Sequence, residues 1–253
     1  MKKLLLCLCM IMALTLSACT DRGGSKESNT AGSSGEQSPS ESGQEQEQEQ
    51  GPAFEVRSVY QVNPAVLEDK TKDTFQDPGK GGTINITLSD NASSVQGRGV
   101  IITGNTVLIN EKGSYMLSGT LSDGNVIVDV AKTDDVILYL NGVNITSKMT
   151  APLFVRSADK VVVSLMDGTE NTLTDTKAST DGATSITAAL FSKEDLVING
   201  TGKLIVSGTF NDGITSKDDL KIMDGTIEVH AQDDGIVGKD SIIVKGGAVT
   251  VVS

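Results

Sequence analysis

The chain has 253 residues and a formal net charge of −12, with 38% hydrophobic but only 3% aromatic residues and no Trp. Its core must therefore be aliphatic. An acidic surface lacks the basic footprint that nucleic acid or anionic lipid headgroups require, so we expect no nucleic-acid partner.

The N-terminal segment, residues 1–18, has the features of a secretory signal. Two lysines precede an apolar run, and Ser17 and Ala18 come directly before Cys19. This pattern resembles the bacterial lipoprotein signal, in which cleavage leaves a cysteine that is then acylated. The alternative is an ordinary secretory signal or an uncleaved anchor. We expect removal of residues 1–18 and a lipid on Cys19 that holds the protein at the extracytoplasmic face of the cell membrane.

Loss of this signal leaves Cys19 as the only cysteine, beside a single histidine, His230. An intramolecular disulfide, a Cys-ligated metal site and a Cys/His catalytic pair are thereby excluded. We expect His230 to occupy a surface strand position.

Two segments precede the main domain. Residues 19–52 contain mainly Ser, Gly, Glu and Gln, which cannot build a core, so we predict a disordered tether. Residues 53–82 are mixed, and AVLEDKTKDTF at 65–75 suits a short helix that caps the following domain.

From residue 83 onward, short β-rich runs alternate with Gly, Asn and Asp. Aliphatic positions recur at a nearly constant spacing. The recurring positions are Leu190, Leu196 and Leu204; Ile214, Leu220 and Ile227; and Ile236, Ile242 and Val249. This repeat predicts a right-handed parallel β-helix over 83–253 with about 22–25 residues per coil, in which each coil buries its aliphatic side on its neighbours. An antiparallel sandwich is the alternative. Because no capping segment follows the last repeat, we expect the domain to be truncated at its C-terminus.

Acidic pairs accompany the repeat. NDGI at 211–214 returns as DDGI at 233–236, so Asn211 and Asp212 should stack on Asp233 and Asp234. Stacked carboxylates repel one another, and calcium is bound by such oxygens. We expect calcium here, with Asp218, Asp219 and Asp240 as further candidates. Solvated Asn/Asp–Gly turns are the alternative.

A basic stripe is predicted by alternation along the same strands. Arg156, Lys193, Lys217 and Lys239 should share one outward column, with Phe154 and Phe191 beside it. Such a stripe could bind uronate carboxylates while the phenyl rings pack on sugar rings. The alternative is local pairing with neighbouring acidic residues.

The NDGI and DDGI repeats, the SKDDL that follows the first of them and LMDGTENTLTD at 165–175 resemble the secreted clostridial carbohydrate-binding β-helix proteins. The resemblance spans about 83–253 and is densest at 186–247. It implies a right-handed β-helix related to calcium-dependent polysaccharide lyases, a row of calcium ions, and binding of cellulose or acidic sugars. The second lysine motif departs from the pattern because VGKDSI lacks one Asp.

The sequence thus predicts a surface-tethered protein that binds a plant-type or acidic polysaccharide with the help of calcium. A calcium-dependent polysaccharide lyase, with Lys217 or Lys239 as base, is the enzymatic alternative. These lysines sit in a repeated column, which favours binding over catalysis. A β-helix adhesin for a protein partner is the third possibility.

Overall fold

The computed structural model describes residues 73–253, and this part of the chain is all-β apart from one short 3-10 helix, η2 (Pro78–Lys80). The predicted signal peptide, Cys19, the tether and most of the lead-in segment lie outside the described residues. The part of the predicted helix that is described, residues 73–75, is not helical. In residues 73–253 no helix has the length and apolar character needed to cross a bilayer.

A 12-stranded sheet has two arms that meet at one long strand, β7 (Asp135–Ser147). The first half of β7 pairs with β9 (Lys160–Leu165) and its second half with β10 (Glu170–Asp175). Beyond β9 lie β14 (Asp195–Gly200), β17 (Asp219–Ile222) and β20 (Ser241–Val244), and beyond β10 lie β15 (Lys203–Gly208), β18 (Thr226–Ala231) and β21 (Ala248–Val252). At the other side are β1 (Ile84–Leu88), β2 (Ser94–Gln96) and β5 (Gly113–Leu121).

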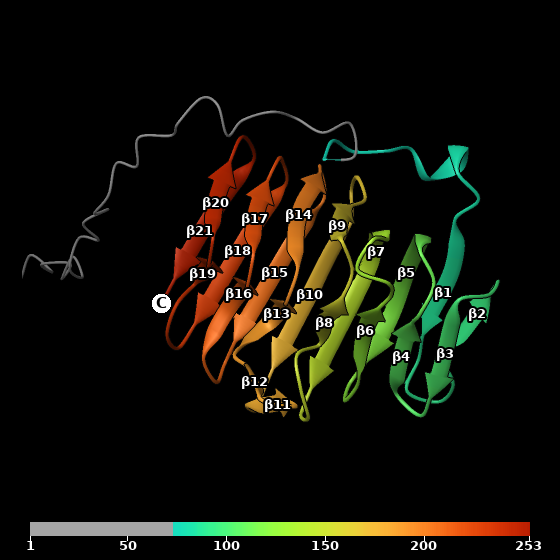
Figure 1. Ribbon diagram of the computed structural model, residues 1–253, viewed down its shortest axis with the longest axis horizontal. Coiled ribbons are helices and arrows are strands. Elements are labelled where there is room, and N and C mark those ends of the chain that lie inside the picture. Colours follow the sequence, from blue (N-terminus) through green and yellow to red (C-terminus); the bar gives the residue numbers. More distant parts are fainter. Residues whose placement is uncertain (1–72) are drawn as a thin grey trace, which may run out of the picture. The chain divides into compact units, whose positions relative to one another are not determined.

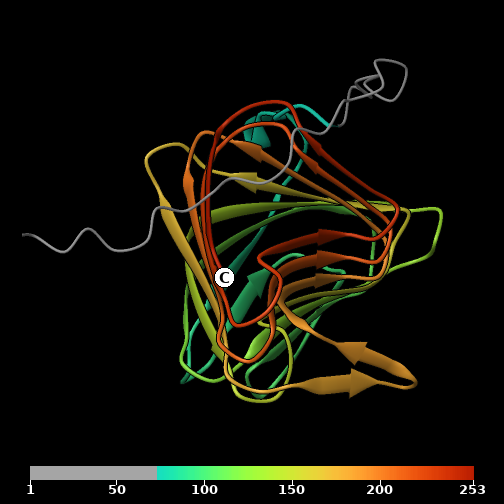
Figure 2. The same cartoon turned by 90° about the vertical axis from the view of Figure 1, so that its left-hand side faces the viewer.

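A seven-stranded sheet faces these arms (Figures 1 and 2). It contains β3 (Val100–Thr103), β4 (Thr106–Ile109), β6 (Asn125–Asp129), β8 (Leu153–Ser157), β13 (Ala188–Ser192), β16 (Asp212–Ser216) and β19 (Ile236–Gly238). Figure 2 shows the sheets curling around one interior. A separate hairpin, β11 (Ser179–Asp181) and β12 (Thr184–Ile186), projects from the turn that follows β10.

The pairing is parallel almost throughout. In residues 73–253 the antiparallel pairs are β1 with β2, β3 with β4, and β11 with β12. Residues that the sequence predicts to be equivalent are direct partners: Ile214 lies beside Ile236, Leu220 beside Ile242, and Ile227 beside Val249. The all-β class with parallel sheets is confirmed, and the right-handed winding of the strands stays a prediction.

The interior is aliphatic, as the composition requires. The seven-stranded sheet and each arm of the 12-stranded sheet contribute one column of buried side chains that continues from strand to strand. The columns are Leu153, Leu190 and Ile214; Val161, Leu196 and Leu220; and Leu173, Leu204 and Ile227. Burial of apolar surface stabilises the folded state by roughly 25 cal/mol per Å². The contacts along these columns therefore make each strand stabilise its neighbours.

The glycines of the acidic pairs serve packing rather than a sharp turn. Neither Gly213 nor Gly235 has a positive φ angle. A Cβ atom on Gly213 would lie 2.2 Å from a methyl carbon of Val229, and one on Gly235 would lie 2.1 Å from a methyl carbon of Val251. The repeated Asp-Gly-Ile therefore marks a position where the seven-stranded sheet closely approaches the β18–β21 arm.

Candidate functional site

The predicted basic stripe is present as a stack of residues at the ends of neighbouring strands. The backbone N–H of Lys193 donates to Val155, that of Lys217 to Ser192, and that of Lys239 to Ser216, at 2.9 to 3.0 Å. Two of the four cations are already paired. Asp181 lies 2.6 Å from Lys193 and 3.4 Å from Arg156, which also contacts Asp129 at 3.2 Å. The hydrogen bond from Lys193, opposed by burial and helped by the charge of Arg156, lowers the pKa of Asp181.

The two phenyl rings beside this stripe are buried, so the prediction that they offer their faces to a sugar is wrong. Phe154 and Phe191 are 1% and 0% exposed, with ring centroids 5.9 Å apart. A small apolar cluster, which includes Ile186 of β12, covers them. The cations pack on the rings instead, with Lys217 5.5 Å from the Phe191 centroid.

The first acidic pair is held by hydrogen bonds within the protein. Asp212 is buried, and its Oδ1 accepts from Asn211 Nδ2 at 3.0 Å and from the backbone N–H of Asp234 at 3.4 Å. Its Oδ2 accepts from Thr215 Oγ1 at 3.0 Å. Asp233 and Asp234 are exposed. Both Asp212 oxygens therefore already have donors within the protein. Because Asp212 is buried at the start of β16, it does not form the solvated turn that was the alternative.

In the second set of acidic residues, the carboxylates of Asp218 and Asp240 lie in contact. Burial, the nearby charge of Asp195 and direct contact with Asp240 raise the pKa of Asp218. Asp219 is partly satisfied, since its Oδ1 accepts from Ser241 Oγ at 2.7 Å. In residues 73–253 no three Asp, Glu, His or Cys side chains are arranged to surround an ion. Calcium accordingly stays a prediction, and the Asp218–Asp240 pair fits a cation better than Asp212 does.

His230 lies on the exposed face of β18, as predicted, with its Nε2 3.2 Å from Glu228 Oε1. The same Glu228 side chain also pairs with Lys203 at 3.2 Å.

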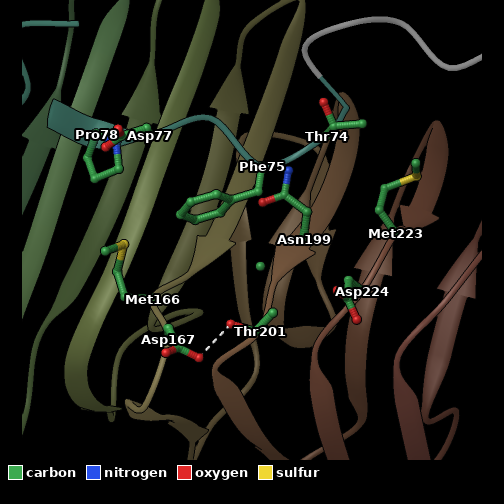
Figure 3. Close-up of a pocket in the computed structure, with 11 residues that line it drawn as sticks. Thr74, Phe75, Asp77, Pro78, Met166, Asp167, Asn199, Thr201, Met223 and Asp224 are labelled. Carbon is green, nitrogen blue, oxygen red and sulfur yellow. Dashed lines mark hydrogen bonds between the residues drawn. The ribbon is translucent and has the colours of Figure 1, made fainter. Parts of the chain in front are cut away.

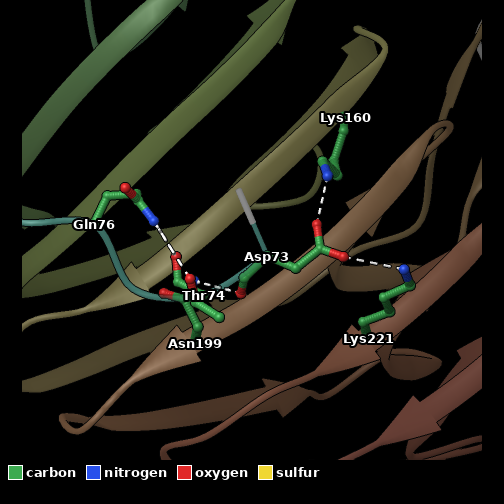
Figure 4. A network of polar contacts seen from close by, with 6 residues as sticks. All are labelled: Asp73, Thr74, Gln76, Lys160, Asn199 and Lys221. Carbon is green, nitrogen blue, oxygen red and sulfur yellow. Dashed lines mark hydrogen bonds and ion pairs between the residues drawn. The ribbon is translucent and has the colours of Figure 1, made fainter. Parts of the chain in front are cut away.

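A different region, the described end of the lead-in segment, forms one wall of a separate groove. Residues 73–80, here named the strap, cross the outer side of β9, β14 and β17 (Figure 4). The Asp73 carboxylate is buried between Lys160 of β9 and Lys221 of β17, 3.1 Å from the latter. The backbone carbonyl of Asp73 accepts from Asn199 Nδ2 of β14 at 2.9 Å. Burial raises the pKa of Asp73, but the two lysines outweigh it and the net pKa is lowered.

Two residues beyond this anchor, Phe75 stands over a cavity of about 490 Å³ (Figure 3). Its ring meets Tyr139 edge-on, with centroids 6.1 Å apart, and remains 43% exposed. The cavity, here named the Phe75 groove, lies between the strap and the turns that follow β9, β14 and β17. Its lining residues are Thr74, Phe75, Asp77, Pro78, Met166, Asp167, Asn199, Gly200, Thr201, Met223 and Asp224.

The lining combines an aromatic ring with several hydrogen-bonding groups. Asp77, Asp167 and Asp224 come from three separate segments, and no basic residue of the described chain lines the groove. Asp167 already accepts from Thr201 Oγ1 at 2.8 Å, which fixes its orientation. A ring face beside oriented carboxylates and amides can hold a ligand with one apolar face and a rim of hydroxyls. The groove has the volume of ordinary small-ligand sites.

The sequence analysis did not predict this groove, because it placed the binding site on the repeated strands. Two features of the sequence nevertheless indicate the groove. MDGT occurs at 166–169 and again at 223–226, and both copies supply a Met and an Asp to the lining. Phe75 is also an isolated aromatic residue in a polar segment.

Comparisons with known proteins identify the family of the chain. A family model described as carbohydrate-binding domain-containing protein matches residues 103–253. A protein of that description from Acetivibrio thermocellus is 39% identical over 144 residues, which cover 56% of this chain and 50% of that protein. The chain thus spans about half the length of this curated relative.

Among solved structures, the gadolinium derivative of the polysaccharide lyase-like protein from C. thermocellum is similar, with a TM-score of 0.58 and 29% identity. The match covers 67% of this chain and 82% of that one. Because the family model covers more than half of the sequence, the chain belongs to the carbohydrate-binding domain-containing protein family.

Proposed function

We propose that the protein binds a polysaccharide and that the Phe75 groove holds the sugar units. The observation that carries this proposal is the exposed Phe75 ring above a cavity lined by three carboxylates and threonine hydroxyls. The predicted site on β8, β13 and β16 is a weaker candidate because its rings are covered and its first two cations are paired.

Charge selects the sugar class at this groove. Its three Asp side chains, with no basic residue of the described chain beside them, repel the carboxylate of a uronate but can accept hydrogen bonds from neutral hydroxyls. An uncharged plant-type glucan therefore fits the groove better than an acidic polymer does.

Substitution of Phe75 tests this assignment. Phe75→Ala removes the ring that would pack on the sugar, and we expect the affinity for hydroxyethyl cellulose to fall about tenfold, the equivalent of about 1.4 kcal/mol. Affinity electrophoresis in gels with and without the polymer measures the change. Met149→Ala, which truncates an exposed side chain outside the groove, is the matched control. Equal retardation of Phe75→Ala and wild type would remove the groove from the proposal.

Calcium remains part of the proposal at the Asp218–Asp240 pair. A bound cation would relieve the repulsion that raises the pKa of Asp218. The two carboxylates cannot complete a shell of six to eight oxygens, so water must supply the rest.

A calcium titration tests the pair directly. We expect Asp218→Asn/Asp240→Asn to lose calcium binding by isothermal calorimetry, while Asp212→Asn retains it because its carboxylate is already hydrogen-bonded. Retention of binding by the double variant, or its absence in wild type, would exclude this site.

A polysaccharide lyase is the second candidate, favoured by the likeness to a lyase-like protein. Incubation with polygalacturonate and ultraviolet detection of unsaturated product decides this, since a pure binding protein gives none. An adhesin for a protein partner remains a third class. A pure adhesin of this kind predicts no retardation by hydroxyethyl cellulose.

Two further features complete the proposal. The first is anchorage by a lipid on Cys19, which the mass of the mature N-terminal peptide tests. The second is right-handed β-helical winding, supported by the in-register parallel pairing of positions that the repeat makes equivalent and tested by a crystal structure.

A further inference from the structure

A second, smaller cavity lies beside the β11–β12 hairpin, away from the Phe75 groove. Its volume is about 320 Å³, and no residue lines both cavities. Figures 1 and 2 both place this hairpin at the side of the domain opposite the strap. The cavity, here named the Phe210 pocket, is lined by Ala178, Ser179, Thr180, Ser185, Ile186, Thr187, Phe210 and Asn211.

The chemistry of this lining differs from that of the Phe75 groove. Among the described residues it contains no ionisable side chain, although the chain as a whole carries a net charge of −12. One aromatic ring, Phe210, is 53% exposed and is surrounded by serine, threonine and asparagine groups. An apolar ring face with neutral donors and acceptors matches a saccharide without charged substituents.

The hydroxyl groups of Ser179, Thr180 and Ser185 line the pocket, and the latter two residues are exposed. A hydroxyl can both donate to and accept from a ligand hydroxyl. These groups are therefore available contacts for a molecule in the pocket.

The segment that carries the ring is fixed by hydrogen bonds to the neighbouring coil. The backbone N–H of Thr209 donates to Asp175 Oδ1 at 2.8 Å, and Thr209 Oγ1 donates to the Asp175 carbonyl at 2.6 Å. On the opposite wall, Ser179 Oγ donates to Thr150 Oγ1 at 2.9 Å. Because the walls are held before a ligand arrives, little ordering of side chains opposes binding.

We propose that the Phe210 pocket is a second saccharide-binding site, specific for uncharged, hydroxyl-bearing sugar units. Phe210 packs on the sugar ring, and the exposed hydroxyls of Thr180 and Ser185 hydrogen-bond its hydroxyls. This site does not depend on the Phe75 groove, because it is formed by different residues on another side of the domain.

The absence of Trp from the chain allows each site to be observed separately. Phe210→Trp places the only indole at the Phe210 pocket, and Phe75→Trp places the only indole at the groove. We expect cellotetraose to shift the emission of Phe210→Trp saturably, and tetragalacturonate to leave it unchanged. No shift with cellotetraose overturns the second site, and an equal shift with tetragalacturonate overturns its specificity for uncharged sugars.

The same reporters separate the two proposals. A response of Phe75→Trp alone would refute the Phe210 pocket and support the groove. A response of Phe210→Trp alone would support the pocket and refute the groove.

Thr180→Val in the Phe210→Trp background tests an accessible hydroxyl of the lining. We expect the affinity for cellotetraose to fall about threefold to tenfold, which corresponds to one hydrogen bond between neutral groups. Thr250→Val, an exposed threonine on β21, is the matched control and should bind as the parent does. An affinity equal to that of the control would refute the role of Thr180.

Discussion

Replacement of Asp73 by Asn should lower the free energy of unfolding by about 3 kcal/mol at pH 7. The substitution leaves the buried Lys160 ammonium, and the half-buried one of Lys221, without a counter-charge. Removal of one partner from a buried ion pair is far more costly than removal of the whole pair, because the remaining charge stays desolvated. Urea unfolding of the domain measures the loss.

The control is an ion pair of the same type on the surface. Arg98 and Glu111 lie 3.8 Å apart with side chains 92% and 54% exposed, so Glu111→Gln should change the unfolding free energy by less than about 0.5 kcal/mol. Saccharide binding at the Phe75 groove should weaken in Asp73→Asn but not in Glu111→Gln, because Asp73 anchors the strap that carries Phe75. A loss no larger than that of Glu111→Gln would show that the strap is not anchored by this carboxylate.

The Asp175→Asn variant should differ from wild type in the pH dependence of its stability. Asp175 is 4% exposed, and burial, with a smaller contribution from the charge of Asp212, raises its pKa to about 6. Hydrogen bonds from the backbone N–H groups of Thr209 and Phe210 oppose this rise.

The sign follows from proton binding. In the unfolded chain Asp175 titrates near its ordinary pKa of about 3.9, so between about pH 4 and pH 6 the folded state holds the extra proton. The contribution of the raised pKa is fully present below pH 4 and is lost as the pH rises through about 6. A change of about two pKa units corresponds to about 3 kcal/mol.

We therefore expect the stability of wild type relative to Asp175→Asn to fall by about 3 kcal/mol from pH 4 to pH 7. Urea unfolding at closely spaced pH values measures this difference. Asp233→Asn removes an exposed carboxylate and should show a nearly constant difference from wild type over the same range. A constant difference for Asp175→Asn as well would contradict the raised pKa.

The sequence was most informative about the interior. The repeated aliphatic positions define strand register, because parallel strands place equivalent side chains side by side. The pairing of Ile214 with Ile236, for example, follows from the repeat alone. The β11–β12 hairpin could not be anticipated in this way, since it belongs to a single long turn and has no equivalent elsewhere in the repeat.

That hairpin explains why the predicted aromatic residues, Phe154 and Phe191, cannot contact a sugar. Alternation correctly assigned Phe154 and Phe191 to the side of the strands that carries the lysines, but it cannot show that Ile186 then covers them. Phe75 and Phe210 are the exposed rings of the described chain, and both lie outside regular strands. Strand periodicity says nothing about such positions, which depend on contacts between distant segments.

The Phe75 groove can form only when most of the domain is present, because the strap contacts strands that lie far along the chain. The contacts of the strap join residues separated by 87, 126 and 148 positions, from Asp73 to Lys160, Asn199 and Lys221. Neighbouring strands of the sheets meet after a few tens of residues, so their loops close at lower entropic cost. The groove is thus a product of the whole domain and not of any single repeat. A chain that ended before β17 would keep many of its strand pairs but lack both Lys221 and the Met223–Asp224 wall.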